Sequence, residues 1–177
     1  MYQKLHYHYD IDLIYNIYGF NLYTGKVGYI AYNFKDVNYI GLVILILVFN
    51  LITTYLLGIV CAYAFPAIVE PAKKIYEAKL AAPLLRLLIT GIFCGLLMFL
   101  AVDTWKKGSP FGCFIYIPVF IISGFDHSIA NMFYFGVSGI INMESIFYIF
   151  VVIIGNAIGG MAMPLLNILG KEDPKNA

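Results

Sequence analysis

The chain has 177 residues, of which 62% are hydrophobic and 12% charged, and its formal net charge is +1. A soluble domain usually carries about 25% charged residues, so a chain of this size has too little polar sequence to cover its apolar surface in water. The composition therefore indicates an integral membrane protein. The small net charge and the lack of a basic stripe argue against nucleic-acid binding.

The first half of the chain contains one short apolar segment and two long ones. The short segment lies within residues 20–34 and cannot span a bilayer alone. Residues 39–65 carry no charge and exceed the roughly 20 residues that a spanning helix needs. Pro66 and the polar segment 70–79 end this span, and residues 80–102 form the second one.

The second half begins with a segment that is broken in the middle. Phe111–Ile122 has only 12 residues, so as a helix it would rise about 18 Å, roughly half of a membrane. A break that contains polar residues, 123–128, follows, and then a second short apolar piece, 129–137. We expect two half-helices that cross the bilayer together. Residues 146–169 form the last span, which ends before a helix-stopping sequence.

These segments predict a tail at residues 1–19, a membrane domain at residues 20–170 and a second tail at residues 171–177. Lysine counts indicate the orientation, because cytoplasmic loops carry more Lys and Arg. With the C terminus inside, Lys35, Lys106, Lys107, Lys171 and Lys175 face the cytoplasm, and Lys73, Lys74 and Lys79 face outward. We therefore expect a multi-pass protein of the plasma (cell inner) membrane with a cytoplasmic C terminus.

The polar break contains the residues with the clearest chemistry. Ser123 and Gly124 precede Asp126 and His127 at a point where the chain leaves the helix at membrane depth. Such backbone is tolerated only where it lines a cavity or is buried in protein, and an ionisable residue there costs about 2.5–3.5 kcal/mol. Histidine changes charge near neutral pH, and a helix N terminus favours an anion. The pattern predicts a midplane site for a small anion beside a proton donor.

Two simpler interpretations compete with this one. A membrane histidine can be satisfied by a neighbouring helix and contribute only packing. Asp126 can cap the second half-helix, as acidic residues often do, or face a membrane interface, and we expect capping. The polar neighbours of His127, including Asn131, favour a site over packing.

Three motifs resemble those of the formate–nitrite transporter family. Residues 123–132, Ser-Gly-Phe-Asp-His-Ser-Ile-Ala-Asn-Met, are similar to its Gly-Phe-Glu-His-Ser signature followed by Ala-Asn-Met. Residues 155–160 resemble its Gly-Asn-x-Ile-Gly-Gly, and residues 22–25 resemble its Leu-Phe-Thr-Gly. The resemblance extends over about residues 20–170.

The resemblance implies an all-α, aquaporin-like channel fold with broken transmembrane segments, an inverted repeat and a homo-pentameric assembly in which each protomer has its own pore. Its partners would be the lipid bilayer, small anions and protons. An anion would enter a basic vestibule and pass a hydrophobic constriction. The central histidine would then stabilise it or protonate it to a neutral acid, which would cross a second constriction. The implied pore residues are His127, Thr24 as its hydrogen-bond partner, Asn156, Asn131, and Phe125 and Leu22 as constriction residues.

The sequence also departs from the family pattern. The family's first helix and half of its second have no counterpart, because nothing before Phe20 is apolar enough to span. Phe49-Asn50 replaces a Gly-Asn pair, and Gly95 stands where the family often has asparagine. The vestibule lysine has no clear counterpart, and Lys107 is the nearest candidate. We therefore expect an N-terminally truncated version of the fold.

Three functional hypotheses follow. The first is passage of a monovalent anion of the formate, nitrite or hydrosulfide class. The second is a truncated, non-conducting remnant that assembles only with full-length subunits. The third, an intramembrane enzyme built on Asp126 and His127, lacks a second catalytic group at the same depth. We expect no enzyme activity, no cofactor and no metal site.

Overall fold

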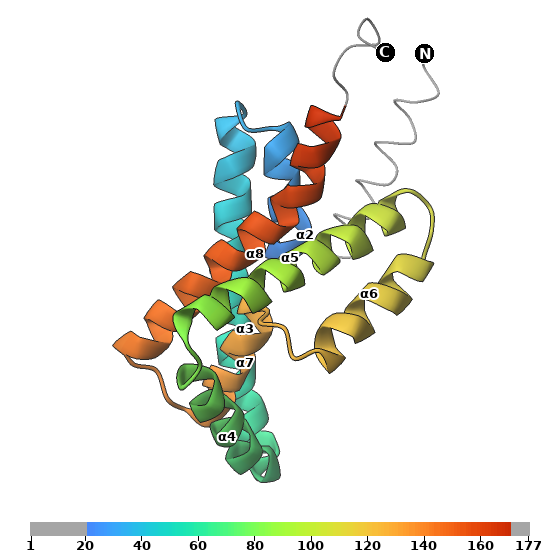
Figure 1. Ribbon diagram of the computed structural model, residues 1–177. Coiled ribbons are helices and arrows are strands. Elements are labelled where there is room, and N and C mark those ends of the chain that lie inside the picture. The colour runs from blue at the N-terminus through green and yellow to red at the C-terminus, as the bar shows by residue number, and fades with distance from the viewer. Residues whose placement is uncertain (1–20, 171–177) are drawn as a thin grey trace, which may run out of the picture.

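The computed structural model describes residues 21–170, and this part of the chain is helical without a strand. Its long helices are α3 (Val37–Ala64), α5 (Leu84–Lys106) and α8 (Met143–Leu169) (Figure 1). Among the described residues, these three are long and apolar enough to cross a membrane. The all-α membrane class is confirmed. The two predicted tails lie outside the described residues.

Shorter helices connect or interrupt these spans. The short apolar segment within residues 20–34, called the first broken segment below, forms α2 (Tyr23–Lys26) and the 3₁₀ helix η1 (Val27–Tyr32). The second consists of α6 (Phe111–Ile122), which has the predicted bounds, and α7 (Ser128–Ser138). Between α3 and α5, the chain forms η2 (Pro66–Ile68) and then α4 (Val69–Leu80).

Helix α4 was missed by the sequence analysis, which treated residues 70–79 only as the polar end of a span. The segment is an amphipathic helix because Ala72 and Tyr76, one turn apart, share a buried face. It packs against α7, and Tyr76 meets the ring of Phe135 edge-on at 4.9 Å between centroids. The second span starts later than predicted, since Pro83 holds an extended conformation just before Leu84.

Helices α5 and α8 lie side by side through a contact made by glycines (Figure 1). A Cβ on Gly95 would collide with the backbone of Asn156, and one on Gly159 would collide with that of Ile92. Small residues let membrane helices approach this closely, because no side chain separates the two backbones. The contact places Asn156 next to the middle of α5, at Gly91 and Gly95.

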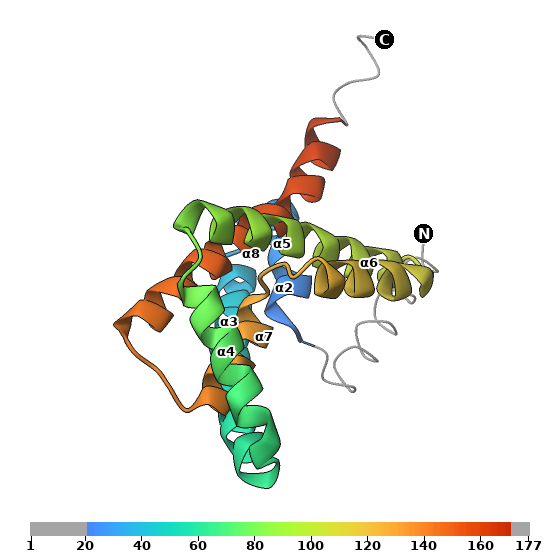
Figure 2. The same ribbon diagram turned by 60° about the horizontal axis from the view of Figure 1, so that its bottom comes forward.

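The three spans differ in how far the rest of the fold covers them. In its most apolar window, 17% of α3 is buried, against 39% for both α5 and α8. The outward face of α3 is therefore left to lipid or to another chain. Helix α6 lies beside α5 in both views (Figure 2), and Phe111, Phe114 and Ile122 on it are exposed.

Candidate functional site

The second break lies between the end of α6 at Ile122 and the start of α7 at Ser128. Gly124 has a φ of 67°, a left-handed conformation that glycine adopts without steric cost. The chain then runs extended through His127, whose φ and ψ are −103° and 116°. The break therefore exposes backbone groups that other helices must satisfy.

His127 is the N-cap residue just before α7 and is 5% exposed. Its Nδ1 accepts a hydrogen bond from the backbone N–H of Ala130 at 3.2 Å, so the imidazole itself caps the helix. Its Nε2 lies 2.9 Å from Oγ1 of Thr24. Because Nδ1 accepts, the neutral ring carries its proton on Nε2 and donates it to Thr24. A second proton would have to displace the Ala130 cap.

The bond between Thr24 and His127 joins the two broken segments. Thr24 lies on α2 and is fully buried, and it is 103 positions away from the histidine. Both residues were predicted site residues, and the hydrogen bond expected from the family resemblance is present. Phe120 of α6 stacks on the imidazole with 5.7 Å between the ring centroids.

The expectation that Asp126 caps the half-helix is wrong, because His127 provides the cap. Asp126 is instead 5% exposed, and its Oδ1 forms an ion pair with Nζ of Lys79 at 2.6 Å. Thr90 of α5 donates to Oδ2 at 2.6 Å. Tyr148 of α8 and Asn131 of α7 donate to Oδ1. A buried carboxylate is tolerable only with such compensation, which a capping position does not supply.

Lys79 is a site residue that the sequence analysis missed. It lies in the last turn of α4, and its side chain is 19% exposed. A signal was available, since Lys79 follows Tyr76 by three positions and Ala72 by seven, which places it on the buried face of an amphipathic helix. Without a helix at residues 70–79, that signal could not be read.

Asn156 lies on α8, is fully buried and binds the backbone of the break. Its Oδ1 accepts from the N–H of Ser128, and its Nδ2 donates to the carbonyl oxygens of Asp126 and Gly91, each at 2.9 Å. The residue was predicted at the site, and it holds the backbone of the break. The hydroxyl of Ser128 is buried and has no hydrogen-bond partner within residues 21–170.

Asn131 was also predicted near the pore. It is 2% exposed, and its Nδ2 donates both to Asp126 Oδ1 at 3.0 Å and to the hydroxyl of Tyr148 at 2.8 Å. Its described contacts are therefore with the carboxylate cluster rather than with the imidazole.

At the first break, residues 21–22 just before α2, Asn50 of α3 binds the backbone as Asn156 does at the second break. Its Oδ1 accepts from the N–H of Tyr23 at 2.9 Å, and its Nδ2 donates to the carbonyl oxygen of Asn21 at 3.1 Å. In the sequence, Asn50 stands in the Phe49-Asn50 pair that departs from the family pattern, and no site role is predicted for it. A polar residue inside an otherwise apolar span was the signal for this contact.

The two predicted constriction residues lie on different parts of the site. Phe125 is half-buried and stacks on Phe93 of α5, with 5.4 Å between centroids. Leu22 is half-buried, precedes α2 and packs against the apolar cluster that includes Val43. No described contact brings Phe125 and Leu22 together, so their roles stay predictions.

Lys107, the predicted vestibule lysine, lies far from the break. It follows α5, and its Nζ pairs with Asp103 Oδ2 at 2.6 Å. The hydrogen bond to Asp103 raises the pKa of Lys107, so the ammonium stays charged beside a carboxylate. Thr90, which contacts Asp126, lies about 25 Å away along the helix at 1.5 Å per residue. The lysine brought to the break is Lys79, and a vestibule role for Lys107 stays a prediction.

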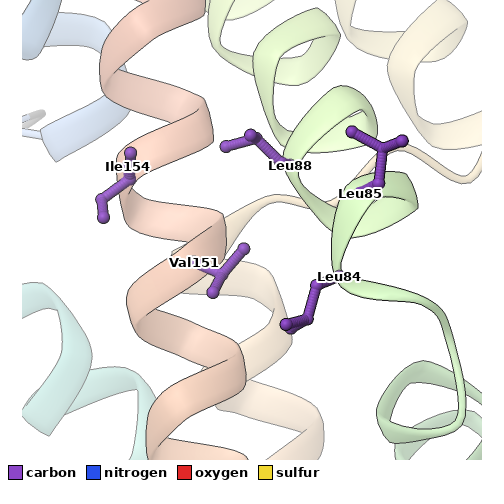
Figure 3. A pocket seen from close by; sticks show the side chains of 5 residues that line it. All are labelled: Leu84, Leu85, Leu88, Val151 and Ile154. Atoms are coloured by element: carbon purple, nitrogen blue, oxygen red, sulfur yellow. The ribbon is translucent and has the colours of Figure 1, made fainter.

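A groove of about 410 Å³ lies between α5 and α8. Its lining, shown in Figure 3, consists of Leu84, Leu85, Leu88, Val151 and Ile154. These side chains offer neither a hydrogen-bond donor nor a charge to an anion. The break is therefore the better candidate site. Within residues 21–170, no three His, Cys, Asp or Glu side chains gather as a metal site would require.

Apolar spanning helices and a buried, charged break together define a multi-pass membrane protein with a polar site inside the membrane-spanning fold. The family model described as "Formate/nitrite transporter" matches residues 13–169. The match covers most of the chain, and the protein belongs to the formate/nitrite transporter family. Membership implies anion transport across a membrane. A search of curated proteins found no match to the chain.

Proposed function

We propose that the protein forms a pore for a small monovalent anion of the formate, nitrite or hydrosulfide class, with His127 as its charge-switching group. The observation that carries the proposal is the hydrogen bond between Thr24 and His127, which joins both broken segments around a buried imidazole. An imidazole at this junction can take up or give a proton beside whatever passes between the two breaks.

The surroundings of His127 suit an anion. The imidazole stands at the N terminus of α7, where backbone N–H groups and the helix dipole favour negative charge. The buried Ser128 hydroxyl is a further donor beside it. Desolvating an ion costs far more than desolvating a neutral acid, so protonation of the anion by His127 would ease its passage.

The other predicted residues receive supporting roles in this proposal. Leu22 and Phe125 form constrictions, Asn156 holds the backbone of the break, and Lys107 belongs to a basic vestibule. Lys79 attracts anions toward the break, although its charge is balanced by Asp126. We further propose a homo-pentamer in the plasma membrane with its C terminus in the cytoplasm, where each protomer carries one pore.

The test is anion flux into proteoliposomes as a function of pH. For the wild-type chain, we expect flux of formate or nitrite to rise as the pH falls and the imidazole becomes charged. His127→Phe removes the titrating group and should abolish this pH dependence. His127→Asn is the sharper variant, because asparagine can still cap α7 but cannot take up a proton in this range.

Phe147→Leu, an exposed position on α8, serves as the control and should behave as wild type. Flux that depends on pH in the same way in both histidine variants would remove His127 from the mechanism. A wild-type chain that carries no anion at any pH would support the non-conducting alternative.

A further inference from the structure

The Asp126 carboxylate accepts hydrogen bonds from three side chains in addition to its ion pair with Lys79. Besides Lys79 from α4, its carboxylate accepts from Thr90 of α5, Asn131 of α7 and Tyr148 of α8. Thr90 binds Oδ2, whereas the other three donors converge on Oδ1. The four helices around the break therefore hold one carboxylate from different directions.

Tyr148 occupies a particular place in this cluster. Its ring is 2% exposed, its hydroxyl donates to Asp126 Oδ1, and the same hydroxyl accepts from Asn131 Nδ2 at 2.8 Å. The hydroxyl thus connects α7 and α8 to the carboxylate. Hydrogen bonds to a charged group in a buried setting are stronger than ordinary ones, so each donor affects how the carboxylate lies.

We propose that Tyr148 and Thr90 are positioning residues for anion passage, which hold the Asp126 carboxylate so that it balances Lys79 and sets the electrostatic potential at His127. The proposal rests on the proposed function, because it assigns these residues to the same site. Neither residue needs to touch the permeating anion. They act through Asp126, whose backbone is directly bonded to that of His127.

The hydrogen-bond donors around Asp126 decide how strongly its negative charge acts on neighbouring groups. Hydroxyl donors stabilise the carboxylate without neutralising it. Their O–H dipoles also offset part of the negative electrostatic potential that the carboxylate creates at neighbouring groups. Without the Tyr148 hydroxyl, the field of Asp126 acts more strongly on the neighbouring imidazole and on an approaching anion. Protonated His127 then becomes more favourable, while the anion is repelled more strongly.

The charged and titratable groups around Asp126 are few among the described residues. Lys79 faces it from α4 and Tyr148 from α8, and His127 adjoins it on the break. Cys94 of α5 lies close enough to interact electrostatically with both Asp126 and Lys79. Lys79, His127 and Cys94 are unchanged in both Tyr148→Phe and Thr90→Val, so we attribute a change in the pH profile to the lost hydroxyl donor.

A purely structural role for Tyr148 is the competing explanation, and the fold supplies a matched control. Tyr76 belongs to the same apolar cluster, is 4% exposed and packs on the same Phe135. Its hydroxyl is buried without a hydrogen-bond partner in the described part of the chain. Tyr76→Phe therefore removes a buried hydroxyl from the same cluster without touching Asp126.

The experiment measures anion flux against pH and against anion concentration for Tyr148→Phe and Tyr76→Phe in proteoliposomes. For Tyr148→Phe, we expect the midpoint of the pH profile to move up by about half a pH unit. The anion concentration at half-maximal flux should rise about threefold to tenfold. Tyr76→Phe should leave both quantities at their wild-type values.

Thr90 provides a second, independent comparison. Thr90→Val removes the donor to Oδ2 and should change both readouts in the same direction, whereas Thr90→Ser retains the hydroxyl and should restore them. If Tyr148→Phe and Thr90→Val both give the same pH midpoint and half-maximal concentration as Tyr76→Phe, the inference is overturned. In that case, a lost pH dependence in His127→Asn would still support the proposed function. A wild-type flux without pH dependence would overturn both.

Discussion

At both breaks in this fold an asparagine side chain binds the backbone, but the two breaks differ in charge. At each break, one asparagine of the following long helix accepts from a backbone N–H and donates to the carbonyl oxygen two residues earlier. Asn50 does so for Tyr23 and Asn21, and Asn156 does so for Ser128 and Asp126. A backbone break inside a membrane must have both kinds of group satisfied, and a primary amide does this with one side chain.

The two breaks differ in the residues whose backbone the asparagine binds. By the asparagine pattern, Asn21 and Leu22 of the first break correspond to Asp126 and His127 of the second. The first break is therefore neutral at these positions. The second contains an ion pair and an imidazole, and it needs donors from α4, α5, α7 and α8 to tolerate them. One asparagine amide is enough to satisfy the backbone of a break. A charged side chain in the break needs additional hydrogen-bond donors from the surrounding helices.

The largest expected effect comes from removing the counterion of the charged break. Lys79→Met leaves Asp126 as an uncompensated buried charge, which should lower the free energy of unfolding by about 3–5 kcal/mol. Denaturation in SDS mixtures, followed by circular dichroism, measures the loss. Lys73→Met on the same helix is the control, because its pair with Glu70 at 3.6 Å is exposed and worth about 0–1 kcal/mol. Equal losses in both variants would contradict the importance of the buried pair.

The two asparagines should differ in the same assay. Asn156→Ala removes three buried hydrogen bonds and should cost about 3 kcal/mol. Asn50→Ala removes two at a half-buried position and should cost about 1 kcal/mol, since water or neighbouring groups can replace part of them. If Asn50→Ala were the more destabilising variant, the second break would not depend more strongly on its asparagine than the first break does.

An effect as small as that of Asn50→Ala is expected at the contact between the two breaks. Thr24→Val keeps the shape of the side chain but removes the acceptor of the His127 Nε2–H, at a cost of about 1 kcal/mol. The same variant should change the pH dependence of flux, because the imidazole loses the partner that holds its proton. Thr24→Ser retains the hydroxyl and is expected to behave as wild type in both measurements. A wild-type pH profile in Thr24→Val would show that this bond does not govern the histidine.

The sequence alone determined the number, order and approximate length of the spans and the location of the breaks. Membrane thickness imposes these lengths on any apolar run, so 12 apolar residues at Phe111–Ile122 already indicated a half-helix. The family signature at residues 123–132 likewise identified His127, the motif at residues 155–160 identified Asn156, and a local polar cluster pointed to the histidine as well.

Only the tertiary structure decided what those residues contact. The ion pair between Lys79 and Asp126 joins positions 47 apart, and the bond between Thr24 and His127 joins positions 103 apart. Such pairs depend on how each helix is rotated about its axis, and helices that are apolar on all sides carry almost no signal for that rotation. The rotation is set by close packing, as where Gly95 admits the backbone of Asn156, and packing is a property of the folded chain.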